Sequence, residues 1–144
     1  MNCLMRFAGL ALWALAFCGS ASAQTAALAG TKTIWLTNAQ GEKVQWGTVV
    51  FEPPVAGRQK FAVNPSAELK EHFLAMRPFK CLAGPRQQLC WFPYTQVAQE
   101  IVGNDYTPLE YALMFLHTKP AALHVNSGNG LYYRLARSER GLAG

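Results

Sequence analysis

The residue pair with the clearest capacity for chemistry is His72 and Glu68, which lie four positions apart. The apolar spacing around them predicts a helix, and residues at i and i+4 of a helix share one face. A carboxylate beside an imidazole is the arrangement of a general acid–base pair, which a small hydrolase would use. The same contact also serves structure, because a carboxylate satisfies a histidine at the edge of a core. We interpret the pair as structural first and keep catalysis as the alternative.

Other catalytic and metal-binding patterns are missing from the sequence. No serine lies in a Gly-x-Ser-x-Gly motif, and Asp105 is the sole aspartate. His117 lies at the expected end of a helix, where a cation offsets the helix dipole, and His124 has no partner nearby in the sequence. The histidines lack the short spacing typical of metal ligands, so we expect neither a metal nor a cofactor. Whether the histidines converge in space is left open.

Two cysteines, Cys81 and Cys90, flank a short segment with a strong turn signal at Gly84–Gln87. Counting outward from this turn pairs Ala83 with Gln88, Leu82 with Leu89, and Cys81 with Cys90. An even pair of cysteines in an oxidising compartment is expected to form a disulfide. The sequence therefore predicts a hairpin that is closed by a disulfide bond.

The tip of this hairpin is the candidate binding site. It presents Pro85, Arg86 and Gln87, and Trp91 follows the second cysteine. Arginine and tryptophan are enriched at binding hot spots, and a rigid loop lowers the entropy cost of binding a partner. The expected partner is an envelope protein or an anionic polymer. A stable turn without any partner is the alternative interpretation.

The first 23 residues have the pattern of a cleaved secretory signal peptide. A short basic segment precedes the apolar run 7–17, and Ala21-Ser22-Ala23 matches the signal peptidase pattern, so cleavage is expected after Ala23. The run is shorter than the roughly 20 residues that span a bilayer. An uncleaved anchor and a lipid on Cys18 are the alternatives. We expect a periplasmic or secreted protein with no transmembrane segment after processing.

Charge and composition further limit the classes of partner that we expect. Loss of the leader lowers the formal net charge from +5 to +4, and the remaining basic residues are scattered along the chain. Nucleic-acid binding needs a concentrated basic face, so nucleic acid is not an expected partner. The oligomeric state cannot be predicted from this pattern.

The periodicity of apolar residues predicts the elements that position these candidates. Residues 24–31 are expected to form a flexible N-terminus, 32–137 a single globular domain and 138–144 a frayed tail. Strands are expected at 33–37, 43–52, 59–63, 121–125 and 131–136, together with the hairpin at 79–92. Helices are expected at 65–76, 95–102 and 108–117. The predicted fold class is α+β: an antiparallel sheet of about five strands with two or three helices packed on it, and one disulfide-closed hairpin.

These observations together favour a non-catalytic protein. The predicted function is an exported periplasmic binding or accessory protein, of an inhibitor or envelope-assembly type, that acts through a protein or envelope-polymer contact. The alternative is a small envelope hydrolase with a site around His72 and Glu68.

Overall fold

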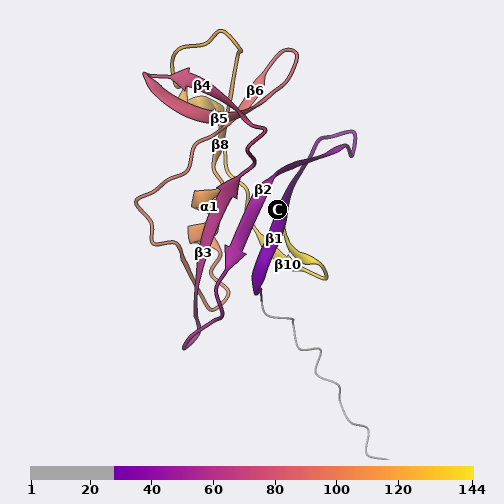
Figure 1. The fold of residues 1–144 in the computed structure, drawn as a ribbon, viewed down its shortest axis with the longest axis vertical. Coiled ribbons are helices and arrows are strands. Elements are labelled where there is room, and N and C mark those ends of the chain that lie inside the picture. Colours follow the sequence, from indigo (N-terminus) through magenta and orange to yellow (C-terminus); the bar gives the residue numbers. More distant parts are fainter. Residues whose placement is uncertain (1–27) are drawn as a thin grey trace, which may run out of the picture.

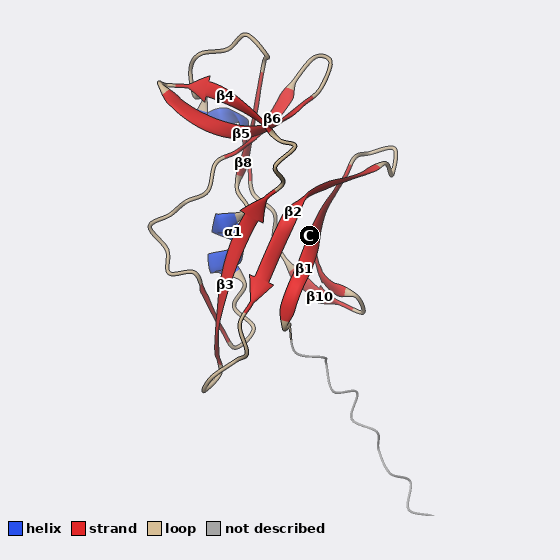
Figure 2. Cartoon of the chain, in the orientation of Figure 1, coloured by secondary structure: helices blue, strands red, loops and turns tan. Residues whose placement is uncertain are grey.

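Strands dominate residues 28–144, the part of the chain that this computed structural model describes (Figure 2). The first sheet has the order β1-β2-β3-β7: β1 Gly30–Thr37, β2 Lys43–Phe51, β3 Arg58–Pro65 and β7 Glu100–Val102. The second has the order β4-β5-β6-β8-β9: β4 Lys70–Leu74, β5 Arg77–Ala83, β6 Gln88–Trp91, β8 Phe115–Thr118 and β9 Gly130–Leu131. A separate hairpin consists of β10 Ala136–Ser138 and β11 Gly141–Ala143. The predicted signal peptide lies outside the described residues.

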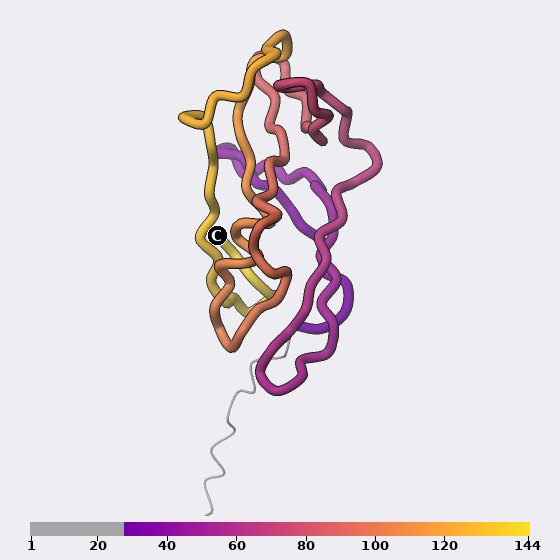
Figure 3. Tube along the Cα trace, turned by 90° about the vertical axis from the view of Figure 1, so that its left-hand side faces the viewer, coloured from indigo at the N-terminus to yellow at the C-terminus, as the bar shows by residue number. Residues whose placement is uncertain are grey.

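The two sheets follow one another along the long axis of the molecule, with the five-stranded sheet at one end (Figure 1). In the other half, the four-stranded sheet faces α1, Thr107–Ala112, and the C-terminal segment (Figure 3). The main apolar core lies between these layers and includes Trp46, Phe51, Leu109 and Phe115. Among residues 28–144, no helix has the length and apolar character needed to cross a membrane.

The predicted α+β class is wrong, because the protein is mostly β. The helix predicted at 65–76 is instead the end of β3, the strand β4 and a turn at Ala75–Met76. Within β4, His72 is half-buried and Leu74 is buried, whereas Phe73 between them is exposed. This alternation has a period of two, and pairing with β5 overrides the helical spacing of the apolar residues.

Of the other two helix predictions, the first fails completely and the second in part. Residues 95–102 form no helix, and their last three residues are β7, which pairs with β3. The helix predicted at 108–117 ends at Ala112, and β8 then pairs with β6. The strand expected at 121–125 is a loop whose Ala122 and Val125 pack on a second core cluster.

Both ends of the described chain make specific contacts with the rest of the fold or within a hairpin. Leu28 is buried in the main core, and its carbonyl accepts a hydrogen bond from Gln59 Nε2. At the other end, Ser138 and Gly141–Ala143 belong to the β10–β11 hairpin, where the sequence predicted fraying. The strand predicted at 131–136 is reduced to Leu131 at the end of β9 and Ala136 at the start of β10.

A bulge in β2 carries Trp46 into the core. Ile34 of β1 opposes Gly47 and the next residue, Trp35, opposes Gln45, so Trp46 is the extra residue of the longer strand. A bulge shifts the alternation of side chains between the two faces of a strand. Trp46 and Gly47 are consequently both buried, whereas simple alternation would expose one of them.

The disulfide-closed hairpin is confirmed with the predicted register. Ala83 opposes Gln88 and Cys81 opposes Cys90, with a disulfide bond between two cysteines whose Cα atoms are 4.0 Å apart. The Gly84 N–H donates to the Gln87 carbonyl at 3.0 Å. A Cβ atom on Gly84 would lie 2.6 Å from that oxygen, so this tight turn requires glycine.

Candidate functional site

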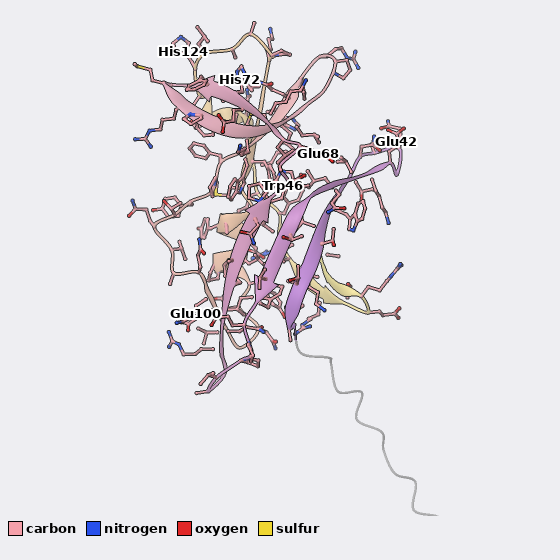
Figure 4. The ribbon with its side chains drawn as sticks, in the orientation of Figure 1. Glu42, Trp46, Glu68, His72, Glu100 and His124 are labelled. Atoms are coloured by element: carbon pink, nitrogen blue, oxygen red, sulfur yellow. A yellow bond between two sulfur atoms is a disulfide. The ribbon has the colours of Figure 1, made fainter. Side chains whose placement is uncertain are left out.

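The predicted acid–base pair does not form. His72 lies in β4, and its Nε2 atom is 2.8 Å from the carbonyl oxygen of Ala122. Glu68 lies before β4 on an exposed turn, nearer the junction of the two sheets (Figure 4). Within the described part of the chain, no hydrogen bond or ion pair joins Glu68 to His72. The expected contact depended on a helix, and the strand removes it.

The remaining histidines do not assemble a metal centre with these residues. His117 is in β8, and His124 is exposed on the loop beyond it. Between residues 28 and 144, no group of three or more histidine, cysteine, aspartate or glutamate side chains is placed to hold a metal ion.

The structure separates the residues of the predicted binding tip. Pro85, Arg86 and Gln87 are exposed at the β5–β6 turn. Trp91 lies at the far end of β6, where its Nε1 donates to the Ala112 carbonyl at 2.7 Å. Its ring also packs edge-on against the core, so Trp91 supports the fold rather than the tip.

A groove that the sequence did not reveal lies between β1 and the C-terminal hairpin; we name it the β1–β11 groove. Its volume is about 1110 Å³. One wall is the continuous stretch Lys32–Thr37 of β1, and the other is Ser138–Gly144, which contains β11. In Figure 1 the hairpin emerges from behind β1. These walls are about a hundred positions apart in the sequence, so no local pattern could have predicted their proximity.

The floor of the groove is apolar and its rim is basic. The floor is made of core side chains: Leu28, Val49, Phe51, Leu109, Leu113 and Phe115. Three basic residues, Lys32, Lys43 and Arg140, line it together with a single acidic residue, Glu139. Such a groove suits an occupant with apolar side chains and negative charge.

Glu110 anchors the chain segment that leads into the hairpin. Glu110 is only 5% exposed, and both of its carboxylate oxygens accept hydrogen bonds. Oε2 accepts a hydrogen bond from the Tyr132 hydroxyl. Oε1 accepts one from the Leu135 backbone N–H, with 2.7 Å between the nitrogen and the oxygen. A buried carboxylate is costly without partners, so these two donors fix the segment next to α1. In the hairpin itself, the Arg137 side chain donates to the Tyr106 hydroxyl at 2.9 Å.

We predict that the Tyr132–Glu110 bond makes stability depend on alkaline pH. The hydrogen bond to Glu110, followed by burial, raises the pKa of Tyr132 from 10.0 to about 12. A raised pKa in the folded state stabilises the fold below pH 10, and this contribution is lost as the pH rises towards 12. In thermal unfolding followed by circular dichroism, Tyr132→Phe should melt below wild type at neutral pH, and the two should converge over that interval.

The matched control is Tyr94→Phe, which removes an exposed hydroxyl with no recorded hydrogen bond among the described residues. The difference in melting temperature between this variant and wild type should be the same at every pH. If the curve of Tyr132→Phe also stays parallel to that of wild type from pH 10 upwards, the bond does not stabilise the folded state.

Comparison with models of known protein families, with curated proteins and with solved structures finds no match to this chain.

Proposed function

We propose that this chain is a small exported binding protein that holds an extended segment of another polypeptide in the β1–β11 groove. The observation that carries the proposal is the open edge of β1, which borders an apolar groove. The segment would add a strand to β1, and backbone hydrogen bonds would supply affinity while the floor selects side chains.

The arrangement of β1 supports this mode of binding. β1 is the first strand of its sheet, and β2 is its sole partner in the described chain, so its other edge offers unpaired N–H and C=O groups. Side chains of a strand alternate between two faces, yet six consecutive residues of β1 line the groove. The backbone edge itself must therefore border the groove.

The wall formed by the C-terminal hairpin favours an extended strand as the occupant of the groove. β10 and β11 pair with each other and with no other strand of the described chain, so the hairpin also has open edges. Each floor residue named above is less than a tenth exposed, so these side chains also pack in the main core. An extended chain between β1 and the hairpin would find backbone partners on both sides.

The charges specify the composition of the segment. The floor would receive apolar side chains from alternate positions of an added strand. Lys32, Lys43 and Arg140 at the rim favour acidic residues beside them. An acidic and apolar segment of an envelope protein fits both conditions.

Export and a non-catalytic role rest on separate observations. The leader pattern predicts secretion, and the buried Cys81–Cys90 disulfide suits an oxidising compartment. Hydrolysis at His72 and Glu68 gains no support from the geometry, because no hydrogen bond or ion pair joins these two described side chains.

Strand addition can be tested with a fluorescein-labelled peptide of eight residues, the length of β1. The peptide alternates valine with threonine and ends in two glutamates, and its binding is followed by fluorescence anisotropy. The control is the same peptide N-methylated at alternate residues, which loses the N–H groups of one edge but keeps every side chain. We expect the control to bind at least about tenfold more weakly, because several hydrogen bonds are lost.

Charge reversal locates the site on the protein. Lys32→Glu/Lys43→Glu/Arg140→Glu should weaken binding of the acidic peptide several-fold, whereas Arg86→Ala, outside the groove, should leave it unchanged. Equal binding of the two peptides would contradict strand addition, and so would a groove that takes a fluorescent fatty acid but not the peptide. Loss of binding in Arg86→Ala alone would place the contact at the β5–β6 turn.

A further inference from the structure

Three loops lie at the end of the molecule that carries the five-stranded sheet; we name this region the loop end. Two are the turns at opposite ends of β5, and the third runs from one side to the other. They are the β4–β5 turn at Ala75–Met76, the β5–β6 turn at Pro85–Arg86 and the segment 119–124 after β8. Figures 1 and 3 view the molecule from two directions at right angles to its long axis, and both place these loops at the same extremity. The β1–β11 groove lies in the other half of the molecule.

Large apolar side chains are exposed on two of these loops and on the adjoining strand β4. Met76 is 96% exposed, Leu123 is 66% exposed and Phe73 is 59% exposed. The Ala75 N–H donates to the Leu123 carbonyl at 2.7 Å, so the two loops are held together. Exposed apolar groups that cluster in this way mark an interaction site more often than single scattered ones do.

The backbone that presents Met76 is strained. Ala75 and Met76 have φ angles of 47° and 63°, which are the left-handed values of a two-residue hairpin turn. Glycine and asparagine normally occupy such a turn. Glycine has no Cβ atom to clash at positive φ, and the short polar side chain of asparagine can hydrogen-bond locally. Strained positions tend to occur at functional sites. Met76 is therefore exposed on a turn that its own side chain does not favour.

The charge of the loop end is positive. The sequence from His72 to Cys90 contains no acidic residue, and neither does 119–130. Glu71, just before the first of these stretches, is 2.9 Å from Lys80 in an ion pair. Arg77, Arg86 and Lys119 are exposed, and no ion pair is recorded for any of them within residues 28–144.

We infer that the loop end binds the surface of an anionic lipid membrane. Apolar side chains that project from loops can enter the boundary between headgroups and acyl chains, and nearby basic residues then attract the anionic headgroups. An anionic polymer would satisfy Arg77, Arg86 and Lys119 but would leave Met76 and Leu123 in water. The combination of both features favours lipid.

Vesicle flotation tests this assignment. The probes are vesicles of phosphatidylcholine with phosphatidylglycerol and vesicles of phosphatidylcholine alone, mixed with the chain that begins at Gln24. We expect binding to the anionic vesicles, a loss of about tenfold or more in Met76→Ser/Leu123→Ser, and a loss of about fivefold in Lys119→Glu. The matched control is Val55→Ser, which removes a 73% exposed valine from the β2–β3 connection and should bind as wild type does.

A second variant separates this role from a structural one. Ala75→Asn/Met76→Gly installs the residues that favour the turn, so it should raise the melting temperature while it weakens vesicle binding. The inference is overturned if wild type ignores anionic vesicles, if it binds neutral vesicles equally well, or if Met76→Ser/Leu123→Ser floats as wild type does. Loss of an envelope protein partner in that variant, without vesicle binding by wild type, would assign the loop end to a protein contact instead.

Discussion

Replacing Trp46 by alanine is expected to lower the free energy of unfolding by about 3–5 kcal/mol. Trp46 is fully buried, and its ring packs edge-on against Trp91 and Phe115, with centroids 5.4 Å and 5.1 Å away. Alanine would remove both aromatic contacts and leave a cavity at the centre of the main core. Urea denaturation followed by circular dichroism measures the loss directly.

Trp46→Phe provides the matched comparison. Within the described chain, Trp46 Nε1 is buried without a hydrogen-bond partner, which makes this N–H a cost to the folded state. Phenylalanine keeps an aromatic ring in the same place and removes the unpaired donor. Its loss of stability should be less than half that of alanine. If alanine costs no more than phenylalanine, Trp46 does not organise the core.

Trp46 also shows what the strand pattern of a sequence can predict and what it cannot. The β-branched and aromatic residues predict the strand at 43–52 correctly, and β2 covers Lys43–Phe51. Simple alternation groups Trp46 with Thr48 and Val50, although Trp46 is buried and Val50 is exposed. The bulge that separates them depends on how β1 aligns with β2. Pairing between strands is tertiary information, and composition alone does not contain it.

The turn at Ala75–Met76 explains the largest error in the fold. Leu69, His72, Phe73 and Met76 have helical spacing, and neither glycine nor asparagine interrupts it. The hairpin turn uses two residues that rarely adopt positive φ, so its usual sequence signal is missing. The hairpin at Cys81–Cys90 was predictable because glycine and proline mark its turn.

Glu110 explains why part of the candidate site was missed. Thr107 and Glu110 match a capping box, which predicts a local role at the start of the helix. In the structure, the Thr107 N–H at the start of α1 donates a hydrogen bond to Asp105 Oδ1. The carboxylate of Glu110 instead accepts hydrogen bonds from the Tyr132 hydroxyl and the Leu135 N–H. An acid among buried apolar residues was the available signal, since such a group needs tertiary partners.

The two proposed binding surfaces, the β1–β11 groove and the loop end, lie on different halves of one small protein. Sequence reasoning located Arg86 of the loop end, because a short local hairpin presents it. Met76 and Leu123 were assigned to other elements, and only folding brings their loops together. A protein held at a membrane by the loop end would direct its groove towards the surrounding compartment. Each of the two binding tests can therefore fail without affecting the other.

Removal of the disulfide in Cys81→Ser/Cys90→Ser is expected to lower the free energy of unfolding by about 2–3 kcal/mol. The bond joins residues nine positions apart, and a crosslink of this length limits the conformational entropy of the unfolded chain. Both cysteines are buried with Leu74 and Leu116 in the second core cluster. The loss is a large share of the roughly 5–15 kcal/mol that stabilises a typical domain.

Two measurements distinguish the crosslink from the burial of new hydroxyl groups. Cys81→Ala/Cys90→Ala removes the bond without placing polar atoms in the cluster, so its loss should be somewhat smaller than that of the serine pair. Amide hydrogen exchange at Leu82 and Leu89, which lie opposite each other inside the loop, should accelerate in both variants. A melting temperature equal to that of wild type in both variants would show that β5 and β6 pair without help from the disulfide.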